Sequence, residues 1–361
     1  MSIDAIQQRL REPLAVARAE HARGRRVIGY VGDDIPVELI LAADALPLRL
    51  IGTPRETPQA DRYLESSFGP ASRSILESWL SGELDFLDAI VFPRSNDTAQ
   101  RLYYYVCELQ RRKVHGGPRT LIYDVARIDR ETSRTYHLAA TQTLASELGV
   151  SASRLAQARA RLSERVGLIQ TLSALRNADD ALSGSMALQV WRSLQLDWTA
   201  QFDSVVREAL SQLPRKRYAR RLLLAGSTPP DERFHRAAEA GGANIVYELF
   251  DESPALALTR WNNAASSIED LAQAYWTARS TAATLLENPD LLVERSRELD
   301  ASGVILWLIE EDEGIVWEVP RQLRRLREAG VPVLSFVRQP WNADASCLDR
   351  VEAFAATLQA P

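Results

Sequence analysis

The chain has 361 residues, which is too long for one ordinary hydrophobic core and predicts two domains or more. Its hydrophobic content of 46%, charged content of 25% and net charge of −5 exclude a strongly basic nucleic-acid-binding class. No apolar run is long enough to span a bilayer, and the first residues lack the apolar core of a signal peptide. The expected location is therefore cytoplasmic.

The first third of the chain alternates between strand and helix patterns. A strand at 26–32 ends at Gly32, and a helix is predicted over 33–46 with Pro36 in its first turn. Strands that alternate with helices predict a parallel sheet covered by helices on both faces. Further strands are predicted at 47–52, 88–93 and 120–125, and further helices at 69–82, 97–112 and 130–147.

The middle of the chain has a different pattern. Residues 151–213 carry apolar residues at helical spacing without an intervening strand, which predicts a helical segment that bridges two α/β units. The sequence thus predicts an N-terminal α/β domain with a leading helix over 1–150, a bridging segment over 151–215 and a C-terminal α/β domain over 216–361. In the last domain, strands are predicted at 220–226, 243–249, 303–309 and 331–336, and helices after 230, from about 316 and from about 344.

Familiar catalytic motifs are absent from the sequence. It contains no GxGxxG after a strand, no GxxxxGK[ST] and no GxSxG. Because ligands of parallel sheets bind beyond the carboxyl ends of the strands, the polar residues that follow each strand are the candidates for binding substrate. They are Gly32, Asp33 and Asp34 in the first half, Ser95 and Asn96 after the strand at 88–93, and Ser227 and Thr228 in the second half.

Each candidate also has a structural interpretation. Asp34 is expected to cap a helix, as are Asn96 and Asp97, and the turn around Ser227 is expected to be a plain tight turn. A second interpretation, compatible with capping, is a ligand-binding pocket in which Asn96 forms a hydrogen bond with the ligand; Asp97 is then a candidate acid or base.

Four acids at 310–313 separate a predicted strand from a predicted helix. Glu311 and Asp312 are candidates for a general base or a hard-metal site, because crowded carboxylates raise one another's pKa. The alternative is a solvated loop stabilised by the helix dipole. Trp307 and Trp317 flank this loop and either wall a pocket or pack in the core.

Two cysteines and four histidines limit the metal chemistry of the chain. Cys107 and Cys347 form no CxxC pair, so a disulfide framework is not expected, and two thiolates cannot hold an iron–sulfur cluster alone. The histidines form no HxxxH pair, which argues against a zinc site. Cys107 is interpreted as a small buried residue, and Cys347 as a residue that caps or packs the last helix.

Five stretches, in the same order, resemble signatures of one family. They are IPVELILAADALPLRLIG, DAIVFPRSNDTAQRLYYYV, LLLAGSTPPDERFHRAAEAGGANIV, GVILWLIEEDEGIVWEVPRQLRRLREAGVPVLSF and RVEAFAATL. They resemble the 2-hydroxyacyl-CoA dehydratase family, which includes benzoyl-CoA reductase catalytic subunits, over about 26–360. The resemblance implies two flavodoxin-like domains with a helical region, paired subunits, an acyl-CoA substrate and an ATP-dependent activator protein. It also implies a [4Fe-4S] cluster held by three cysteines.

The three cysteine positions of that family hold other residues in this chain. By the resemblance they correspond to Gly69, Asn96 and Asp312, which offer no ligand, an amide and a hard carboxylate. The sequence therefore predicts a divergent member with a degenerate iron–sulfur site and no cluster of its own.

Three hypotheses for the function follow. In the first, the chain is the cluster-less subunit of a heterodimer and shapes an acyl-CoA pocket beside a cluster-bearing partner, with a homodimer as the alternative assembly. In the second, it is a redox-independent enzyme that uses Asp312, Glu311 or Asp97 as acid and base. In the third, it is a non-catalytic ligand-binding or scaffolding protein.

Overall fold

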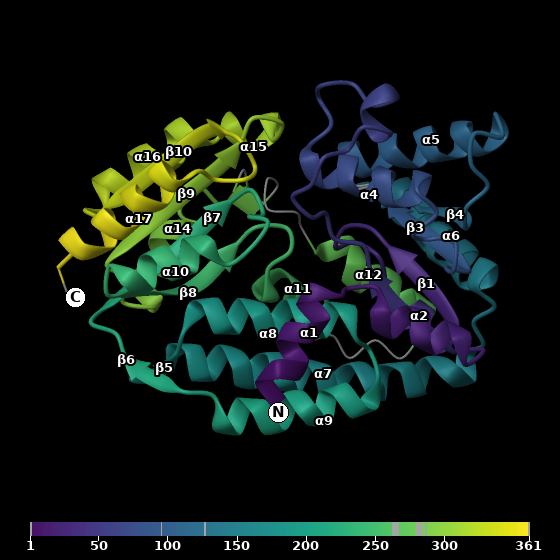
Figure 1. The fold of residues 1–361 in the computed structure, drawn as a ribbon, viewed down its shortest axis with the longest axis horizontal. Helices are drawn as coiled ribbons and strands as arrows, with labels where there is room; N and C mark the ends of the chain where they lie inside the picture. Colours follow the sequence, from purple (N-terminus) through teal and green to yellow (C-terminus); the bar gives the residue numbers. More distant parts are fainter. Residues whose placement is uncertain are drawn as a thin grey trace. The chain divides into compact units, whose positions relative to one another are not determined.

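The computed structural model describes residues 2–94, 96–125, 128–261, 267–278, 284–285 and 287–359 (Figure 1). The chain divides into two compact units. Unit 1 comprises Met1–Gly167, Arg192–Val206 and Leu258–Ala278, and unit 2 comprises Leu168–Trp191, Arg207–Ala257 and Arg279–Pro361.

Unit 1 contains a four-stranded parallel sheet in the order β2-β1-β3-β4. Its strands β2 and β3 are buried at every residue, as expected for a parallel sheet covered on both faces. The register pairs Tyr30 with Arg49 and Pro93 with Tyr123, so neighbouring strands end side by side. The strands are β1 (Arg26–Tyr30), β2 (Ala45–Arg49), β3 (Ala89–Pro93) and β4 (Arg119–Tyr123).

Helices pack against this sheet in two groups. In one group α5 contacts β3, β4 and α4, and in the other α6 contacts β4, α3 and α12. Helix α12 comes from a late part of the chain, yet it belongs to unit 1. The helices of this unit include α1 (Ser2–Arg11), α2 (Ala15–Ala22), α3 (Val37–Ala42), η1 (Ala60–Arg62), α4 (Pro70–Leu80), α5 (Asp97–Arg111), α6 (Glu131–Leu148) and α12 (Ile268–Thr277).

The helix predicted over 33–46 is shorter in the structure. It begins at Val37 after the N-cap residue Pro36, and it ends at Ala42. Asp44 adopts a left-handed conformation with φ of 59°, which ends the helical path and lets β2 begin at Ala45. The predicted capping role of Asp34 is wrong, because the N-cap lies at Pro36 and no side-chain cap bond forms there.

Unit 2 contains a second four-stranded parallel sheet, in the order β10-β9-β7-β8. Helices α10 and α17 pack together, as do α14 and α16. These elements are β7 (Arg220–Gly226), α10 (Arg233–Ala240), β8 (Ala243–Leu249), α11 (Pro254–Trp261, ending in unit 1), α14 (Leu291–Glu298), β9 (Gly303–Ile309), α15 (Glu313–Val316), α16 (Val319–Glu328), β10 (Val333–Gln339) and α17 (Ala345–Thr357).

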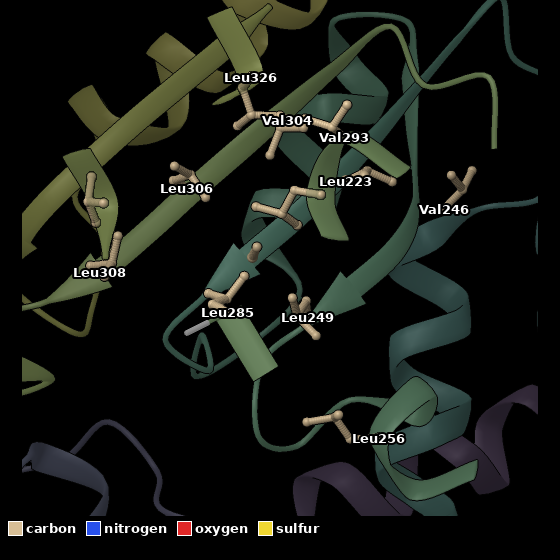
Figure 2. Close-up of a cluster of buried hydrophobic side chains, with 13 residues drawn as sticks. Leu223, Val246, Leu249, Leu256, Leu285, Val293, Val304, Leu306, Leu308 and Leu326 are labelled. Carbon is tan, nitrogen blue, oxygen red and sulfur yellow. The ribbon is translucent and has the colours of Figure 1, made fainter. Parts of the chain in front are cut away.

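The two faces of the unit 2 sheet carry separate cores. On β9, Val304, Leu306 and Leu308 join a buried aliphatic cluster that also receives side chains from α14 and α16 (Figure 2). Trp307, which alternates with them, packs against Phe234 on α10 with ring centroids 4.6 Å apart. Each fully buried valine or leucine side chain of the aliphatic cluster stabilises the fold by about 1.5–3 kcal/mol relative to exposure in water.

Besides α11, three helices of the middle segment contribute residues to both units. They are α7 (Ala152–Asn177), α8 (Gly184–Leu196) and α9 (Ala200–Gln212). The prediction that no strand interrupts 151–213 is wrong, because β5 (Asp180–Leu182) lies between α7 and α8 and pairs with β6 (Arg215–Arg217). Three-residue strands bury too little apolar surface to produce a recognisable sequence pattern.

The predicted fold class is confirmed: the chain contains two flavodoxin-like parallel sheets and a helical middle segment. Within the described ranges, no helix has both the length and the apolar character needed to cross a membrane.

Candidate functional site

The carboxyl edge of the unit 2 sheet carries Asp312, a candidate acid whose pKa is raised. Strand β7 lies between β9 and β8, so the loops that follow these three parallel strands share one edge. They contribute Ser227 after β7, Asp251 after β8, and Glu311 and Asp312 after β9. This edge brings together the predicted residues Ser227, Glu311 and Asp312.

Ser227 is held by strand β9 on both its backbone and its side chain. Its N–H donates to the carbonyl of Trp307 at 2.7 Å, and its Oγ accepts from the N–H of Ile309 at 3.0 Å. The preceding Gly226 has φ of +117°, and a Cβ there would lie 2.2 Å from the Trp307 carbonyl oxygen. Only glycine allows this close approach of the two strands.

Asp312 is half-buried at the N-cap position of α15, where its side chain forms no cap bond. Burial raises the pKa of its carboxyl group to about 6; a hydrogen bond with Ser227 opposes the rise, and the negative charges of Asp251 and Glu311 add to it. A carboxyl group with this pKa exchanges its proton near neutral pH, as a general acid or base requires.

The other candidates of unit 2 have different surroundings. Thr228 is half-buried, and its carbonyl accepts from the Nε1 of Trp341 at 2.9 Å. Trp307 is fully buried, so its core interpretation is confirmed. Trp317 is 83% exposed, so the core interpretation is wrong for that residue. Asp251 is not among the residues predicted from the sequence, although it follows strand β8 by two residues, as the other candidates follow their strands.

At the carboxyl edge of unit 1, the predicted acids are engaged in ion pairs. Asp33 pairs with Arg49, the last residue of β2, and Asp34 accepts from Arg260 at 2.9 Å. Both arginines are almost fully buried, and neither was identified from the sequence. Gly32 has φ of +71°, which suits the turn after β1. The charges of Asp33 and Asp34 thus neutralise buried arginines.

The loop between β3 and α5 forms a helix cap. Asn96 is exposed, and its Oδ1 accepts from the N–H of Ala99 at 2.9 Å, so the predicted capping role is confirmed. Asp97 is the exposed first residue of α5 and lies 3.9 Å from the guanidinium of Arg101. Ser95, another predicted binding residue, lies outside the described residues.

The fold and the sites define a two-unit α/β protein whose polar residues gather at the carboxyl edges of its parallel sheets. A family model described as 2-hydroxyglutaryl-CoA dehydratase, D-component, matches residues 34–358. The chain belongs to this family.

Two further similarities cover different amounts of the chain. A benzoyl-CoA reductase subunit of Thauera aromatica is 35% identical over 80 residues, and the match spans 22% of this chain and 21% of that protein. The solved structure of the SBP FpvC of P. aeruginosa in complex with a Ni2+ ion covers 92% of this chain and 95% of its own. Its sequence identity of 12% and TM-score of 0.23 are too low to equate the two folds.

The three residues that the family resemblance places at the cluster-ligand positions offer no thiolate. Gly69 is the N-cap residue of α4 and has no side chain, Asn96 uses its oxygen to cap α5, and Asp312 offers a carboxylate. Cys107 lies within α5 with its Sγ 3.4 Å from the Oγ1 of Thr120.

The cysteines occupy positions inside helices. Cys107 is half-buried, so its interpretation as a buried residue is only partly correct. Cys347 is buried in the first turn of α17, where its N–H donates to the capping carboxylate of Asp344 at 2.9 Å; it packs and does not cap. Among the side chains that the structure describes, no group of three or more His, Cys, Asp or Glu residues is arranged to hold a metal ion.

Proposed function

We propose that this chain is a subunit of an acyl-CoA dehydratase or reductase system that carries no iron–sulfur cluster of its own. In this role it shapes an acyl-CoA pocket beside a homologous subunit that supplies the cluster. The family membership and the partial similarity to a benzoyl-CoA reductase subunit support the dehydratase-like part of this proposal.

The donor set is the observation that supports the absence of a cluster. Iron–sulfur clusters are held by soft thiolates, normally three or four of them. This chain has two cysteines, both inside helices, and neither follows a strand. A pair of subunits stays chemically viable when only one of them has lost its ligands, because the iron of the other can still perform the reduction.

The test is anaerobic co-purification with a homologous subunit that retains three cysteines. We expect a stable complex that contains iron, and unchanged iron content when Cys107 and Cys347 of this chain are both replaced by serine. This chain purified alone should be colourless. A brown protein with about four irons per chain, which loses them in the double serine variant, would overturn the proposal.

A second function is favoured by the raised pKa of Asp312. With a pKa of about 6, this carboxylate can take a proton from a substrate at neutral pH and return it to a leaving hydroxyl group without any reductant. The second candidate is therefore redox-independent elimination or addition of water on an acyl-CoA or small hydroxy acid.

An activity screen without reductant tests this second function. Turnover should fall at least 100-fold in Asp312→Asn, within the usual contribution of a general acid or base, and remain normal in Glu313→Gln, a matched change at the next residue. Activity that depends on the ionised base should rise through about pH 6. Normal turnover in Asp312→Asn would exclude this role.

Thermal unfolding with CoA tests the third hypothesis, a non-catalytic binding protein. An increase in melting temperature with CoA but no turnover would favour it, since ligand at 1,000 times Kd stabilises the folded protein by about 4 kcal/mol.

A further inference from the structure

Glu38 on α3 and Tyr275 on α12 form a buried pair of titratable groups in unit 1. The two residues are 1% and 0% exposed, and the Oη of Tyr275 lies 2.9 Å from the Oε2 of Glu38. We propose that Glu38 is a neutral carboxylic acid in the folded protein, and that its proton holds α12 on α3 and on the loop after β1. This inference does not depend on the proposed function, in which neither residue takes part.

The number of protons in this contact indicates a neutral Glu38. The same Tyr275 hydroxyl group lies 3.3 Å from the carbonyl oxygen of the buried Ile35, so one phenolic proton faces two acceptors. An ionised Glu38 would take that proton and remove the donor from the Ile35 carbonyl, which is costly inside a protein. A protonated Glu38 donates to the Oη of Tyr275 instead. Tyr275 then donates to Ile35, and each group in the chain has a partner.

Glu77 on α4 is a buried acid of the same unit with different partners. It is 7% exposed, and its Oε2 accepts from the backbone N–H groups of Gln59 and Ala60 at 2.9 and 2.8 Å. The side-chain amide of Gln59 donates to its Oε1 at 3.2 Å. Three N–H donors favour an ionised carboxylate, whereas the hydroxyl group beside Glu38 can also accept a proton. The two acids are therefore distinguished by their partners and not by burial.

The charged groups around Glu38 agree with a neutral acid. Burial is the largest influence and raises the pKa of Glu38 above its ordinary value of 4.5. Its own backbone N–H, the Tyr275 hydroxyl group and the positive charge of Arg159 on α7 oppose this rise. On the other side of the pair, Tyr275 faces Arg260 of α11 and Tyr123 of β4. Burial and the neighbouring Glu38 raise the pKa of Tyr275, so the phenol keeps its proton.

The pair joins α12 to the first part of the chain. Helix α12 also contacts α6, where the Nε2 of His137 lies 2.8 Å from the carbonyl oxygen of Ala272. Arg260, from the same late part of the chain, donates to Asp34 in the loop after β1 at 2.9 Å. Because the pKa of Glu38 is raised, docking of α12 is fully stabilised below pH 4.5 and weakens as the pH rises through the folded-state pKa. Ionisation thus releases α12 from this loop, at the carboxyl edge of the unit 1 sheet.

Infrared spectroscopy of the full chain detects the proton on Glu38 directly. The wild-type spectrum at pH 7, minus that of Glu38→Gln, should contain the carbonyl band of a protonated carboxyl group. Glutamine removes the acid but keeps a donor to Tyr275, so this variant should fold. The matched control is Glu77→Gln, whose difference spectrum should contain a carboxylate band instead. A carboxylate band in the Glu38→Gln difference, without the protonated-carboxyl band, would overturn the inference.

Amide hydrogen exchange of α12 tests whether the proton holds the helix. At pH 9 the α12 amides should exchange about tenfold faster in the wild-type protein than in Glu38→Gln, the change that corresponds to one pKa unit. At pH 5 the two proteins should exchange alike, because Glu38 is then neutral in the wild-type protein. Comparison at equal pH removes the intrinsic pH dependence of exchange. The amides of α5, which lacks a contact with this pair, should not differ between the two proteins at either pH.

A second measurement needs no variant. In the wild-type protein, the ratio of α12 exchange to α5 exchange should rise between pH 5 and pH 9, and this holds even if Glu38→Gln does not fold. A constant ratio would show that the proton does not hold α12. If Glu77→Gln removed the pH dependence of α12 as completely as Glu38→Gln, the effect would be a general response of unit 1 to a lost acid, and the inference would be wrong.

Discussion

Glu248 on β8 is the centre of a buried charge network in unit 2. Arg176 donates to its two oxygens at 2.7 and 2.5 Å, and the Nε2 of His235 lies 2.8 Å from Oε1. All three side chains are almost fully buried. Burial alone would raise the pKa of Glu248, but the charge of Arg176 and the contact with His235 lower it to about 2. Removing one member of such a network destabilises the fold, because it leaves another buried charge without its partner.

Glu248→Gln should therefore lower the free energy of unfolding by about 3–5 kcal/mol at pH 7, because it leaves the Arg176 charge without a counterion. The folded-state pKa is below the ordinary value of 4.5, so the stabilisation is fully present above pH 4.5 and is lost as pH falls toward 2. Urea unfolding of both proteins between pH 2 and 7 measures this. A difference that stays constant over that range would contradict the charge-based account.

The pKa shift of Asp312 has the opposite effect on how the stability of the protein depends on pH. Its folded-state pKa of about 6 lies above the ordinary value of 3.8, so folding favours the protonated form and the ionised carboxylate destabilises the protein above about pH 6. Asp312→Asn should raise the melting temperature at pH 8 and change it little at pH 4. Melting curves of the wild-type protein and Asp312→Asn at the two pH values test this. An equal change of melting temperature at pH 4 and pH 8 would show that ionisation of Asp312 does not affect the stability of the fold.

At the scale of elements, helix α5 depends on its N-cap. Asn96 accepts the N–H of Ala99 at 2.9 Å, which satisfies one of the free donors in the first turn. Asn96→Ala should cost about 1 kcal/mol in the free energy of unfolding, whereas Asn96→Ser keeps a capping oxygen and should cost much less. Chemical denaturation of the two variants compares them directly. Equal costs would mean that the side chain acts through another contact.

Elements with strong periodicity could be predicted from the sequence. The seven-residue strand at 303–309 was predicted with its observed bounds, because a continuous apolar run between turn residues has few alternatives. Helix α3 was predicted too long, since nothing in the local sequence indicates the left-handed conformation of Asp44. Strand β5 was missed because three residues show no periodicity.

The candidate site was predictable only in part, because its chemistry depends on contacts between distant segments. The acidic loop and Ser227 were visible as polar residues after strands. That the loops carrying Ser227 and Asp312 share one edge follows from the strand order β9-β7-β8, which the sequence does not display. Arg260 could not be assigned to Asp34, since the two are 226 positions apart.

At the scale of the whole molecule, the chain passes between its two units repeatedly. The divisions fall after residues 167, 191, 206, 257 and 278, and the first three lie inside helices α7, α8 and α9. Unit 2 therefore includes Arg176 and the segment 168–191, which precede the C-terminal α/β pattern in the sequence. Asn244 of β8 depends on this segment too, because its Oδ1 accepts from the N–H of Gly184 at 2.7 Å.

A fragment of residues 216–361, the C-terminal domain expected from the sequence pattern, should consequently fail to fold alone. It lacks Arg176, which leaves Glu248 buried without its counterion, and this loss of about 3–5 kcal/mol is a large part of the stability of a domain. Circular dichroism and proton NMR of the fragment test this. A matched fragment that also carries Glu248→Leu removes the uncompensated charge and should recover some structure if that charge is the cause. A cooperative melting transition in the unaltered fragment would show that the C-terminal sheet needs neither Arg176 nor the preceding helices.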